Sequence, residues 1–293
     1  MPDSPASVTR FVIVPKVAHP WYEEVVRGAR RQVDAMAAHV TGPLELEYEP
    51  PAQASTETQE SVLERVLATR PTGIAIDLVD SVAQLPAVAR ARELGVAVVV
   101  FDSPAPEPGV TGVGNDFAEQ GRIAASRLAT LLDGVGEVAV MRGVPEAPNH
   151  DQRYRAQLAV LAEHPGITVV DGGADWDDIE RAEQEAAAVL RDRPSLRGYL
   201  ACDASGPIGI ARAVVSAGRA GTVTVVGMDS IAPIAAAVAD GVLESSVATI
   251  PRMQGAMAVL MLWQASLGQP IPRFVDTGIE VVTAANAAEY LTG

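Results

Sequence analysis

Cysteine is almost absent from this chain, because Cys202 is the single cysteine among 293 residues. One cysteine excludes an intramolecular disulfide, and its apolar neighbours in GYLAC favour a small buried packing residue. The four histidines are scattered along the chain. Since histidine and cysteine together show no metal-ligand spacing, we expect no bound metal and no cofactor.

Basic residues are also in deficit. The chain has 22 Lys and Arg against 37 Asp and Glu, which gives a formal net charge of −15. The field of such a molecule repels phosphate backbones and anionic membrane surfaces. We therefore expect no nucleic-acid partner.

Long apolar runs are missing as well. No run approaches the roughly 18 residues that a membrane-spanning helix needs. The first residues, MPDSPASVTR, lack the basic and apolar regions of a secretory signal. From the residues alone we expect either a cytosolic protein or an exported protein whose export segment is not part of this sequence.

Enzyme motifs are incomplete wherever they begin. Gly112 and Gly114 start a glycine pattern, but Phe117 occupies the third glycine position of the dinucleotide fingerprint, and a Walker loop is missing. Ser205 follows Asp203 in DASG, which lacks the first glycine of a nucleophile elbow. The sequence thus gives no support for catalysis.

What the chain does contain is a repeated alternation of short apolar runs and segments with helical spacing. Continuous apolar strands between amphipathic helices are typical of a parallel sheet covered on both faces. Two successive sets of about four βα units predict two similar doubly wound α/β lobes. The expected strands are 11–14, 44–48, 73–78 and 96–101, followed, after the Pro/Gly-rich stretch SPAPEPGVTGVG, by 137–142, 166–170, 197–202 and 222–227.

The end of the chain departs from this alternation. We expect a strand in ESSVATIP, an apolar helix in MQGAMAVLMLWQASLG, one strand in FVDTGIEVVT and a short terminal helix. A chain that adds these elements after two lobes is expected to cross between the lobes more than once, through a multi-stranded hinge. Two helix starts are marked by capping boxes, Asp116 with Glu119 and Asp177 with Glu180.

Polar and aromatic side chains follow the expected strands, where open α/β sheets bind ligands. A neutral polyhydroxyl ligand suits this set, because its C–H faces stack on aromatic rings while its hydroxyls bond to carboxylates and a guanidinium. The candidates are His19, Trp21 and Tyr22 in a loop after the first strand, then Asp102, Ser103, Arg153, Trp176, Asp203, Asp229 and Thr249.

Each candidate also has a structural interpretation that the sequence leaves open. These alternatives are helix capping for Asp203 and Asp229, hydrophobic core for Trp21 and Tyr22, a loop hydrogen bond for His19, and a surface ion pair with Asp151 or Glu146 for Arg153.

The residues resemble one family, the type I periplasmic binding proteins, and especially the ribose-type sugar-binding components of ABC transporters. The likeness covers nearly the whole chain. It is carried by AHPWYEEVVRGA, VVVFDS, VGNDFAEQGRIAA, the interval from Gly143 to Arg153, ADWDD, YLACDASGPIGIARA, TVVGMDS, DGVLESSVATIP and TGIEVVTAANAAEYL.

The resemblance implies two Rossmann-like lobes joined by three crossover strands, with residues 1–114 and 250–277 in the N-terminal lobe and 115–249 and 278–293 in the C-terminal lobe. It also implies that the candidates are the ligand-binding residues. Ser103, Asp203 and Thr249 stand where arginine, asparagine and glutamine are common in the family. The pocket is therefore expected to be more acidic, and a pentose, a hexose and a linear polyol all remain open as ligands.

The function that the resemblance implies is capture of a small sugar or polyol in the inter-lobe cleft by hinge closure, and delivery to the membrane permease of an ABC transporter. We expect a monomer without enzymatic turnover, in an extracytoplasmic location, periplasmic or lipid-anchored. The alternatives are the effector-binding domain of a LacI-type transcription regulator, for which the first expected strand, at about Val8, leaves no room for a DNA-binding head, and an enzyme on the same fold.

Overall fold

The computed structural model describes residues 8–40, 42–105, 107 and 109–291, so most of MPDSPASVTR lies outside the described residues. The described chain forms two compact units, each assembled from two stretches of sequence. Unit 1 takes the described residues of Met1–Asn115 and Ile250–Thr277, and unit 2 those of Asp116–Thr249 and Gly278–Gly293. The described chain therefore passes from one unit to the other three times.

The described residues of unit 1 form a six-stranded sheet in the order β11-β5-β4-β3-β1-β2, in which every pairing is parallel. The central strands are rich in buried β-branched residues, as expected for parallel strands covered on both faces. The strands are β1 (Thr9–Val14), β2 (Leu44–Tyr48), β3 (Gly73–Ile76), β4 (Ala97–Phe101), β5 (Thr111–Gly114) and β11 (Phe274–Asp276).

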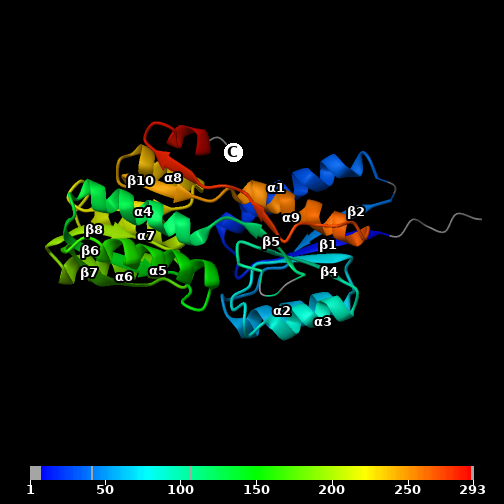
Figure 1. Ribbon diagram of the computed structural model, residues 1–293. Helices are drawn as coiled ribbons and strands as arrows, with labels where there is room; N and C mark the ends of the chain where they lie inside the picture. The colour runs from blue at the N-terminus through cyan, green and yellow to red at the C-terminus, as the bar shows by residue number, and fades with distance from the viewer. Residues whose placement is uncertain (1–7, 41, 106, 108, 292–293) are drawn as a thin grey trace, which may run out of the picture. The chain divides into compact units, whose positions relative to one another are not determined.

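Four helices cover this sheet among the described residues of unit 1. They are α1 (Pro20–Ala37), α2 (Thr56–Ala68), α3 (Leu85–Glu93) and α9 (Pro251–Ser266). Figure 1 shows α1 and α9 over one face of the sheet and α2 and α3 over the other. Proline at the first position of α1 and of α9 suits a helix start, because its missing N–H has no intrahelical partner there.

Helices α1 and α9 approach each other closely enough to require glycine at their contact. A Cβ built on Gly255 would lie 1.9 Å from the backbone oxygen of Val25, and one built on Gly28 would lie 2.0 Å from that of Arg252. Neither position has room for a side chain. The helix from the second stretch of unit 1 is thereby packed onto the first helix of the chain.

The described residues of unit 2 form a second six-stranded sheet, in the order β12-β10-β9-β8-β6-β7. Strand β12 is antiparallel to β10, and the other pairings are parallel. The strands are β6 (Val135–Arg142), β7 (Gly166–Ala174), β8 (Leu196–Leu200), β9 (Thr224–Met228), β10 (Ser245–Ala248) and β12 (Glu280–Thr283).

The helices of unit 2 alternate with its strands (Figure 1). Helix α4 packs against α5, and α6 packs against α7. They are α4 (Phe117–Leu131), α5 (Pro148–Ala162), α6 (Ile179–Asp192), α7 (Ser205–Ser216), α8 (Ala232–Ala239) and a terminal 3-10 turn, η1 (Ala287–Tyr290).

Alternating parallel strands and helices in both units confirm the predicted pair of doubly wound α/β lobes. Each lobe has its own apolar core, centred on residues such as Val12 and Ile76 in unit 1 and Val138 and Leu200 in unit 2. These cores hold the strands in place, and therefore also the residues that follow the strand ends.

Several local predictions were wrong. Trp21 and Tyr22 lie in the first turn of α1, not in a loop, because Pro20 already begins the helix. FVDTGIEVVT forms two strands in different sheets, β11 and β12, which are separated by a break at Gly278 with φ of 85°. The Pro/Gly-rich stretch ends in a further strand, β5.

The two predicted capping boxes differ in outcome. The side chain of Asp116 accepts a hydrogen bond from the backbone N–H of Glu119, which confirms the first cap. The second prediction was wrong by one residue, since Asp178 caps α6 by accepting from the N–H of Arg181. Asp177 precedes the cap in the left-handed region, with φ of 60°.

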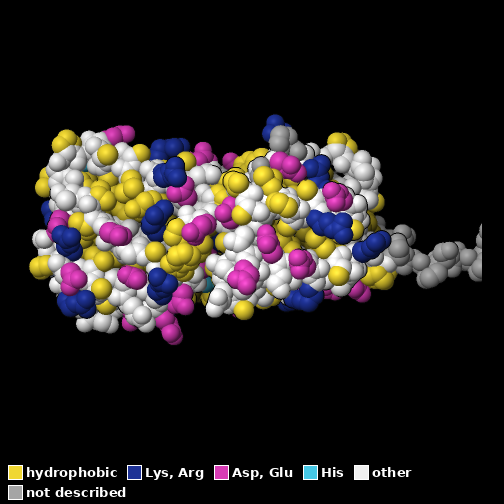
Figure 2. Space-filling model, turned by 90° about the horizontal axis from the view of Figure 1, so that it is seen from below, with side chains coloured by type: hydrophobic (Ala, Val, Ile, Leu, Met, Phe, Trp, Pro, Cys, Tyr) yellow, Lys and Arg dark blue, Asp and Glu magenta, His cyan; other side chains and the backbone are white. Residues whose placement is uncertain are grey.

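The surface carries charges of both signs. On the face shown in Figure 2, acidic and basic side chains are interspersed, and the described residues form no continuous basic patch there. None of the helices in the described part of the chain is both long and apolar enough to span a membrane.

Candidate functional site

The candidate residues lie after the carboxyl ends of strands in both units, and several of them have an unusual backbone conformation. Six non-glycine residues among those described have positive φ, and four of these lie just after strands: Asp102 after β4, Trp176 and Asp177 a few residues after β7, and Asp229 after β9. Non-glycine residues in this region are strained and cluster at functional sites. Three of the four are residues that the sequence predicted for the ligand site.

His19, Trp21 and Tyr22 lie together at the start of α1. His19 is the N-cap of the helix, and its Nδ1 accepts a hydrogen bond of 3.1 Å from the N–H of Trp21. The rings of Trp21 and Tyr22 form an edge-to-face pair with centroids 5.1 Å apart, and Tyr22 also packs edge-on against Phe101 at 6.2 Å. Trp21 and Tyr22 are buried, as the hydrophobic-core alternative requires.

The hydroxyl of Tyr22 belongs to a buried polar network that sequence reasoning missed. Asp77, directly after β3, accepts from Tyr22 Oη at 2.6 Å and pairs with Lys16 Nζ at 2.9 Å, both through Oδ2. Ser103 Oγ donates to the other oxygen of Asp77. Lys16 and Asp77 are 1% and 0% exposed, so this ion pair is buried away from solvent.

Asp102 is the second buried carboxylate of unit 1 at a strand end. Its N–H donates to the carbonyl of Val113, and its Oδ1 accepts from Gln254 Nε2 at 3.3 Å. Gln254 Nε2 also lies 3.4 Å from Asn115 Oδ1. A glutamine from α9 therefore orients two oxygens at the strand ends of unit 1.

Arg153 is fully buried in unit 2, so the surface ion pair that the sequence left open does not describe it. Its Nε donates to Gln120 Oε1 at 2.7 Å, its Nη1 donates to the carbonyl of Cys202 at 3.2 Å, and its guanidinium lies 4.9 Å from the centroid of the Phe117 ring. The acidic neighbour Asp151 pairs instead with Arg155. Arg153 is thus held in one orientation beside the end of β8.

Asp203 and Asp175 form a pair of buried carboxyl groups in unit 2. Asp203 Oδ1 accepts from the N–H of Gly206 at 3.0 Å, in the first turn of α7, so its capping alternative is supported. Asp175 is hydrogen-bonded to Asp203 through the side chains, and its pKa is raised well above the usual value. Burial is the main cause, followed by the charge of Asp203, the hydrogen bond to it and the charge of Asp177.

Trp176 is the exposed aromatic candidate, with 37% of its surface accessible. It follows Asp175, whose Oδ1 accepts from the N–H of Asp177 at 3.0 Å and so closes a turn around Trp176. The guanidinium of Arg181 lies 5.7 Å from the centroid of the Trp176 ring. The indole is therefore set on a hydrogen-bonded turn.

Asp229 and Thr249 are brought together at the ends of β9 and β10. Thr249 donates to Asp229 Oδ1 through its hydroxyl and through its N–H, the latter at 3.3 Å. The carbonyl of Asp229 accepts from Ser246 Oγ at 2.5 Å. Helix α8 begins after Ile231 without a side-chain cap, so the capping alternative for Asp229 was wrong.

The structure thus groups the predicted residues into one set in each unit. Their roles in ligand binding stay a prediction. The set in unit 1 is His19, Trp21, Tyr22, Asp102 and Ser103, and the set in unit 2 is Arg153, Trp176, Asp203, Asp229 and Thr249.

Sequence reasoning missed further polar residues that hold these sets. Lys16, Asp77 and Asp175 each follow a strand by one or two residues, so the rule that found the other candidates also indicates them. Gln120 and Gln254 lie inside helices, where nothing local in the sequence distinguishes them from solvent-facing glutamines.

One group in unit 2 has the composition of a metal site. Ligand atoms of His150, Asp177 and Asp203 lie within 4.8 Å of one another. We assign no metal to this group, because His150 Nδ1 accepts from the N–H of Val144 at 2.9 Å and Asp203 Oδ1 accepts from Gly206. Because Nδ1 accepts, the neutral ring carries its proton on Nε2, the nitrogen nearest Asp177, and Nε2 then has no lone pair for a metal.

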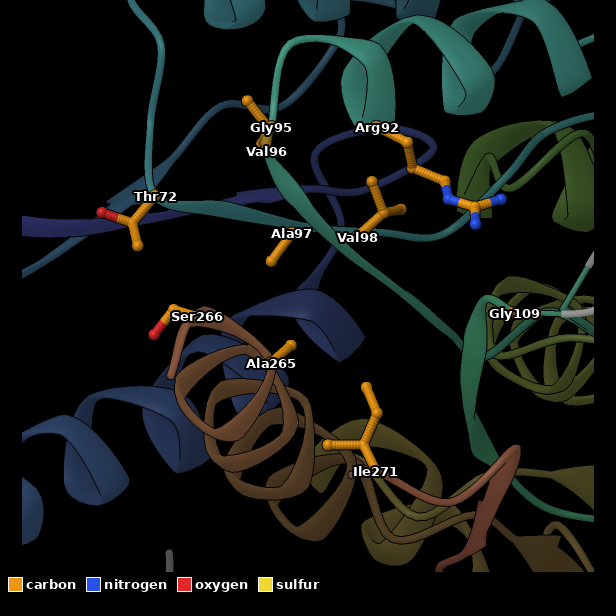
Figure 3. Close-up of a pocket in the computed structure, with 10 residues that line it drawn as sticks. All are labelled: Thr72, Arg92, Gly95, Val96, Ala97, Val98, Gly109, Ala265, Ser266 and Ile271. Carbon is orange, nitrogen blue, oxygen red and sulfur yellow. The ribbon is translucent and has the colours of Figure 1, made fainter. Parts of the chain in front are cut away.

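Unit 1 also has an open depression of about 420 Å³ away from its strand-end residues. Thr72 and Ala97 place it at the amino-terminal ends of β3 and β4, and Ala265, Ser266 and Ile271 line its other side (Figure 3). This depression lies at the end of the strands opposite to the candidate residues, and two of its polar side chains bond within the protein, Thr72 to the N–H of Arg10 and Arg92 to Glu107.

Comparison with known proteins identifies the family. The periplasmic binding protein domain matches residues 10–270. A D-ribose/D-allose-binding protein of Pseudomonas aeruginosa is 29% identical over 244 residues, which cover 79% of this chain and 76% of that protein. The D-allose-binding periplasmic protein of Escherichia coli is 24% identical over 278 residues, covering 91% and 88%.

The fold agrees with a solved structure over its full length. The crystal structure of an ABC transporter solute-binding protein from Burkholderia graminis, in complex with D-arabinose, superposes with a TM-score of 0.90 at 26% identity and covers 99% of both chains. The predicted type I periplasmic binding protein fold is therefore confirmed. With most of its length matched by the family, this chain belongs to the periplasmic binding proteins.

Proposed function

We propose that this chain is the solute-binding protein of an ABC transporter and that its ligand is a small neutral sugar or polyol. The observation that carries the proposal is that each unit places an aromatic ring and buried hydrogen-bonding groups at the carboxyl ends of its parallel strands. The relatives named above bind ribose, allose or arabinose, which supports the same ligand class for this chain.

The chemistry of the two sets fits a polyhydroxyl ligand. Carboxylates such as Asp102 and Asp229 accept hydrogen bonds from hydroxyls, and the guanidinium of Arg153 donates them. The indole of Trp176 offers a flat apolar face for the C–H side of a sugar ring. A sugar carries no net charge and cannot neutralise the acidic groups, so these groups need hydrogen-bond partners within the protein. Gln254 is such a partner for Asp102, and Thr249 for Asp229.

The remaining expectations belong to this proposal. We propose that the chain acts without turnover, delivers its ligand to the membrane subunits of the transporter, works as a monomer and resides outside the cytoplasm. Closure on the ligand is the family mode of binding and shifts the protein toward a state that only the ligand stabilises. The alternative of a transcription regulator is not favoured, because the relatives named above are binding proteins.

Titration calorimetry against D-ribose, D-allose, D-arabinose, D-xylose and linear polyols tests the proposal. We expect at least one of them to bind, and a ligand at 100 times its dissociation constant to stabilise the fold by about 2.7 kcal/mol. Trp176→Ala should weaken binding about tenfold, since it removes a stacking surface worth about 1–2 kcal/mol.

Trp263→Ala is the matched control, because Trp263 lies on α9 in unit 1, away from both sets. It should leave the dissociation constant unchanged. Absence of heat and of thermal stabilisation with every compound would contradict the proposal, and so would equal losses of affinity in the two tryptophan variants.

A further inference from the structure

Asp175 and Asp203 form a pair of buried carboxyl groups whose hydrogen bonding to the backbone uses only half of their oxygens. Both side chains are buried, at 0% and 2% exposure. Each uses one oxygen on a backbone N–H, that of Asp177 for Asp175 and that of Gly206 for Asp203. The second oxygen of each, Oδ2, is buried and has no N–H or O–H donor among the described residues.

A hydrogen bond between the two carboxyl groups would satisfy these remaining oxygens. Two ionised carboxylates both accept and cannot bond to each other, so the hydrogen bond between Asp175 and Asp203 requires a proton on one of them. We place that proton on Asp175, because it is completely buried and burial raises its pKa. Two adjacent carboxyl groups in a dry site cannot both stay ionised, as in other carboxyl pairs that share a proton.

The position of Asp175 connects it to two predicted ligand residues. Through Oδ1 it closes the turn that carries Trp176, and its carboxyl group interacts with that of Asp203. A Cβ on Gly206 would lie 3.1 Å from Asp203 Oδ1 and 3.2 Å from Asp175 Oδ2, so the start of α7 lies directly against the pair. Both carboxyl groups are therefore held between fixed backbone segments.

We propose that Asp175 is a positioning residue that carries a proton in the binding-competent protein and donates it to Asp203, so that ligand affinity falls when this proton is lost at higher pH. The inference rests on the proposed function for its ligand. With the proton present, the pair has a single negative charge, and Asp203 keeps one orientation. Without it, two adjacent carboxylates repel each other beneath Trp176 and at the start of α7.

Other titratable groups face the pair and have to be separated from it. Asp177 lies on the same turn, Cys202 and Tyr199 come from β8 and its end, and His150 and Arg153 come from α5. Burial raises the pKa of the Cys202 thiol and of the Tyr199 hydroxyl, so both keep their protons to higher pH than usual. His150 therefore needs its own control.

The test is the dissociation constant of a bound sugar, measured by calorimetry from about pH 5 to about pH 9.5, a range that spans the ordinary titration of histidine and the thiol. For the unaltered protein, we expect an alkaline limb in which the dissociation constant rises by up to about tenfold per pH unit. EDTA in every buffer excludes a contribution from a metal ion.

Asp175→Asn separates positioning from simple packing. Its amide donates to Asp203 at every pH, so the alkaline limb should disappear. Asp175→Ala removes the donor and should weaken binding by about tenfold to a hundredfold, because it leaves the Asp203 carboxylate buried without this partner. Asp175→Asn should recover much of that loss, whereas a merely space-filling role gives both variants the same pH profile as the unaltered protein.

Two controls complete the design. Glu163→Gln removes an exposed carboxylate at the end of α5 and should retain the alkaline limb. His150→Gln should retain it as well. A limb that survives Asp175→Asn, or that disappears in His150→Gln, overturns the proposal.

A second readout needs no ligand, and so distinguishes failure of this inference from failure of the proposed function. Because the folded chain holds the Asp175 proton to higher pH than the unfolded chain, the free energy of unfolding falls as pH rises from the ordinary carboxyl range to the raised pKa. Asp175→Asn should remove that part of the slope. If no sugar binds at any pH, the proposed function fails, while an unchanged slope in Asp175→Asn overturns the shared proton by itself.

Discussion

Units 1 and 2 each bury an aspartate directly after a strand, and they neutralise it by different means. Asp77 in unit 1 pairs with the ammonium of Lys16 and accepts from Tyr22 and Ser103. Asp175 in unit 2 bonds to another carboxyl group, and none of the charged groups that shift its pKa among the described residues is basic. The same fold thus supports a side-chain cation in one unit and a proton from solvent in the other.

The difference has a thermodynamic meaning. A buried ion pair loses several kcal/mol when one partner is removed, because the remaining charge is left in a dry site. A shared proton can be withdrawn by pH alone, without any mutation. The stability of unit 1 should therefore depend strongly on substitution of the ion pair, and that of unit 2 on pH.

Removing the cation of unit 1 should have the largest effect. Lys16→Met leaves Asp77 buried without its cation and should lower the free energy of unfolding by roughly 3–5 kcal/mol, measured by urea denaturation. Arg65→Met is the control, since its ion pair with Glu49 is largely exposed and is worth at most about 1 kcal/mol. Equal losses of stability in the two variants would mean that the buried ion pair of unit 1 is worth no more than an exposed one.

A combined variant sharpens this result. Asp77→Asn in the Lys16→Met background removes the buried charge and should restore part of the lost stability, although Tyr22 and Ser103 then lose a charged acceptor. Failure to recover any stability would mean that Lys16 acts through packing of its stem rather than through charge.

Trp21 of unit 1 and Trp176 of unit 2 should differ in their contribution to folding stability. Trp21 is 4% exposed and Trp176 is 37% exposed. Trp21→Ala should therefore cost about 3 kcal/mol or more of folding stability, while Trp176→Ala should cost clearly less and act mainly on ligand affinity. Thermal and urea unfolding of both variants measure the stability change, and a larger loss for Trp176→Ala would reverse the assignment.

The smallest expected effect concerns the far alkaline range of unit 1. Burial, followed by the charge of Glu23, raises the pKa of Tyr48 from 10.0 to about 12. The unfolded chain then ionises first, so stability is lost as pH rises from 10.0 toward about 12.

Tyr48→Phe should abolish this loss of stability. Urea unfolding at several alkaline pH values measures it. At neutral pH it should stabilise the fold by at most about 1 kcal/mol, because the buried hydroxyl has no hydrogen-bond partner among the described residues. An alkaline slope that persists in Tyr48→Phe would assign the loss to another group.

Sequence analysis predicted the elements that depend on neighbouring residues and missed those that depend on contacts distant in sequence. Strands such as FVIV and AVVVF were predicted because their apolar residues are adjacent in the chain. Strand β5 was missed, since TGVG carries two glycines and is a strand only through its pairing with β4 and β11. FVDTGIEVVT reads as one strand because nothing local shows that its halves join different sheets.

The candidate residues show the same limit. Asp102, Trp176 and Asp229 were found because a single rule, polar or aromatic residues after a strand, applies to each alone. Their partners could not be found in this way. Gln254 reaches Asp102 across 152 positions of sequence, and Gln120 is the partner of Arg153 only because α4 packs against α5.

The assembly of each unit from two stretches of chain governs when the protein can fold during synthesis. Helix α9 and strand β11, which complete unit 1, and strand β12, which completes the sheet of unit 2, are all made after residue 250. While the ribosome is still adding them, the contact of Gly28 with α9 is unavailable and β5 has an unpaired edge. Neither unit can reach its final structure before the ribosome has made these elements, so much of the preceding chain has to wait for its last partners.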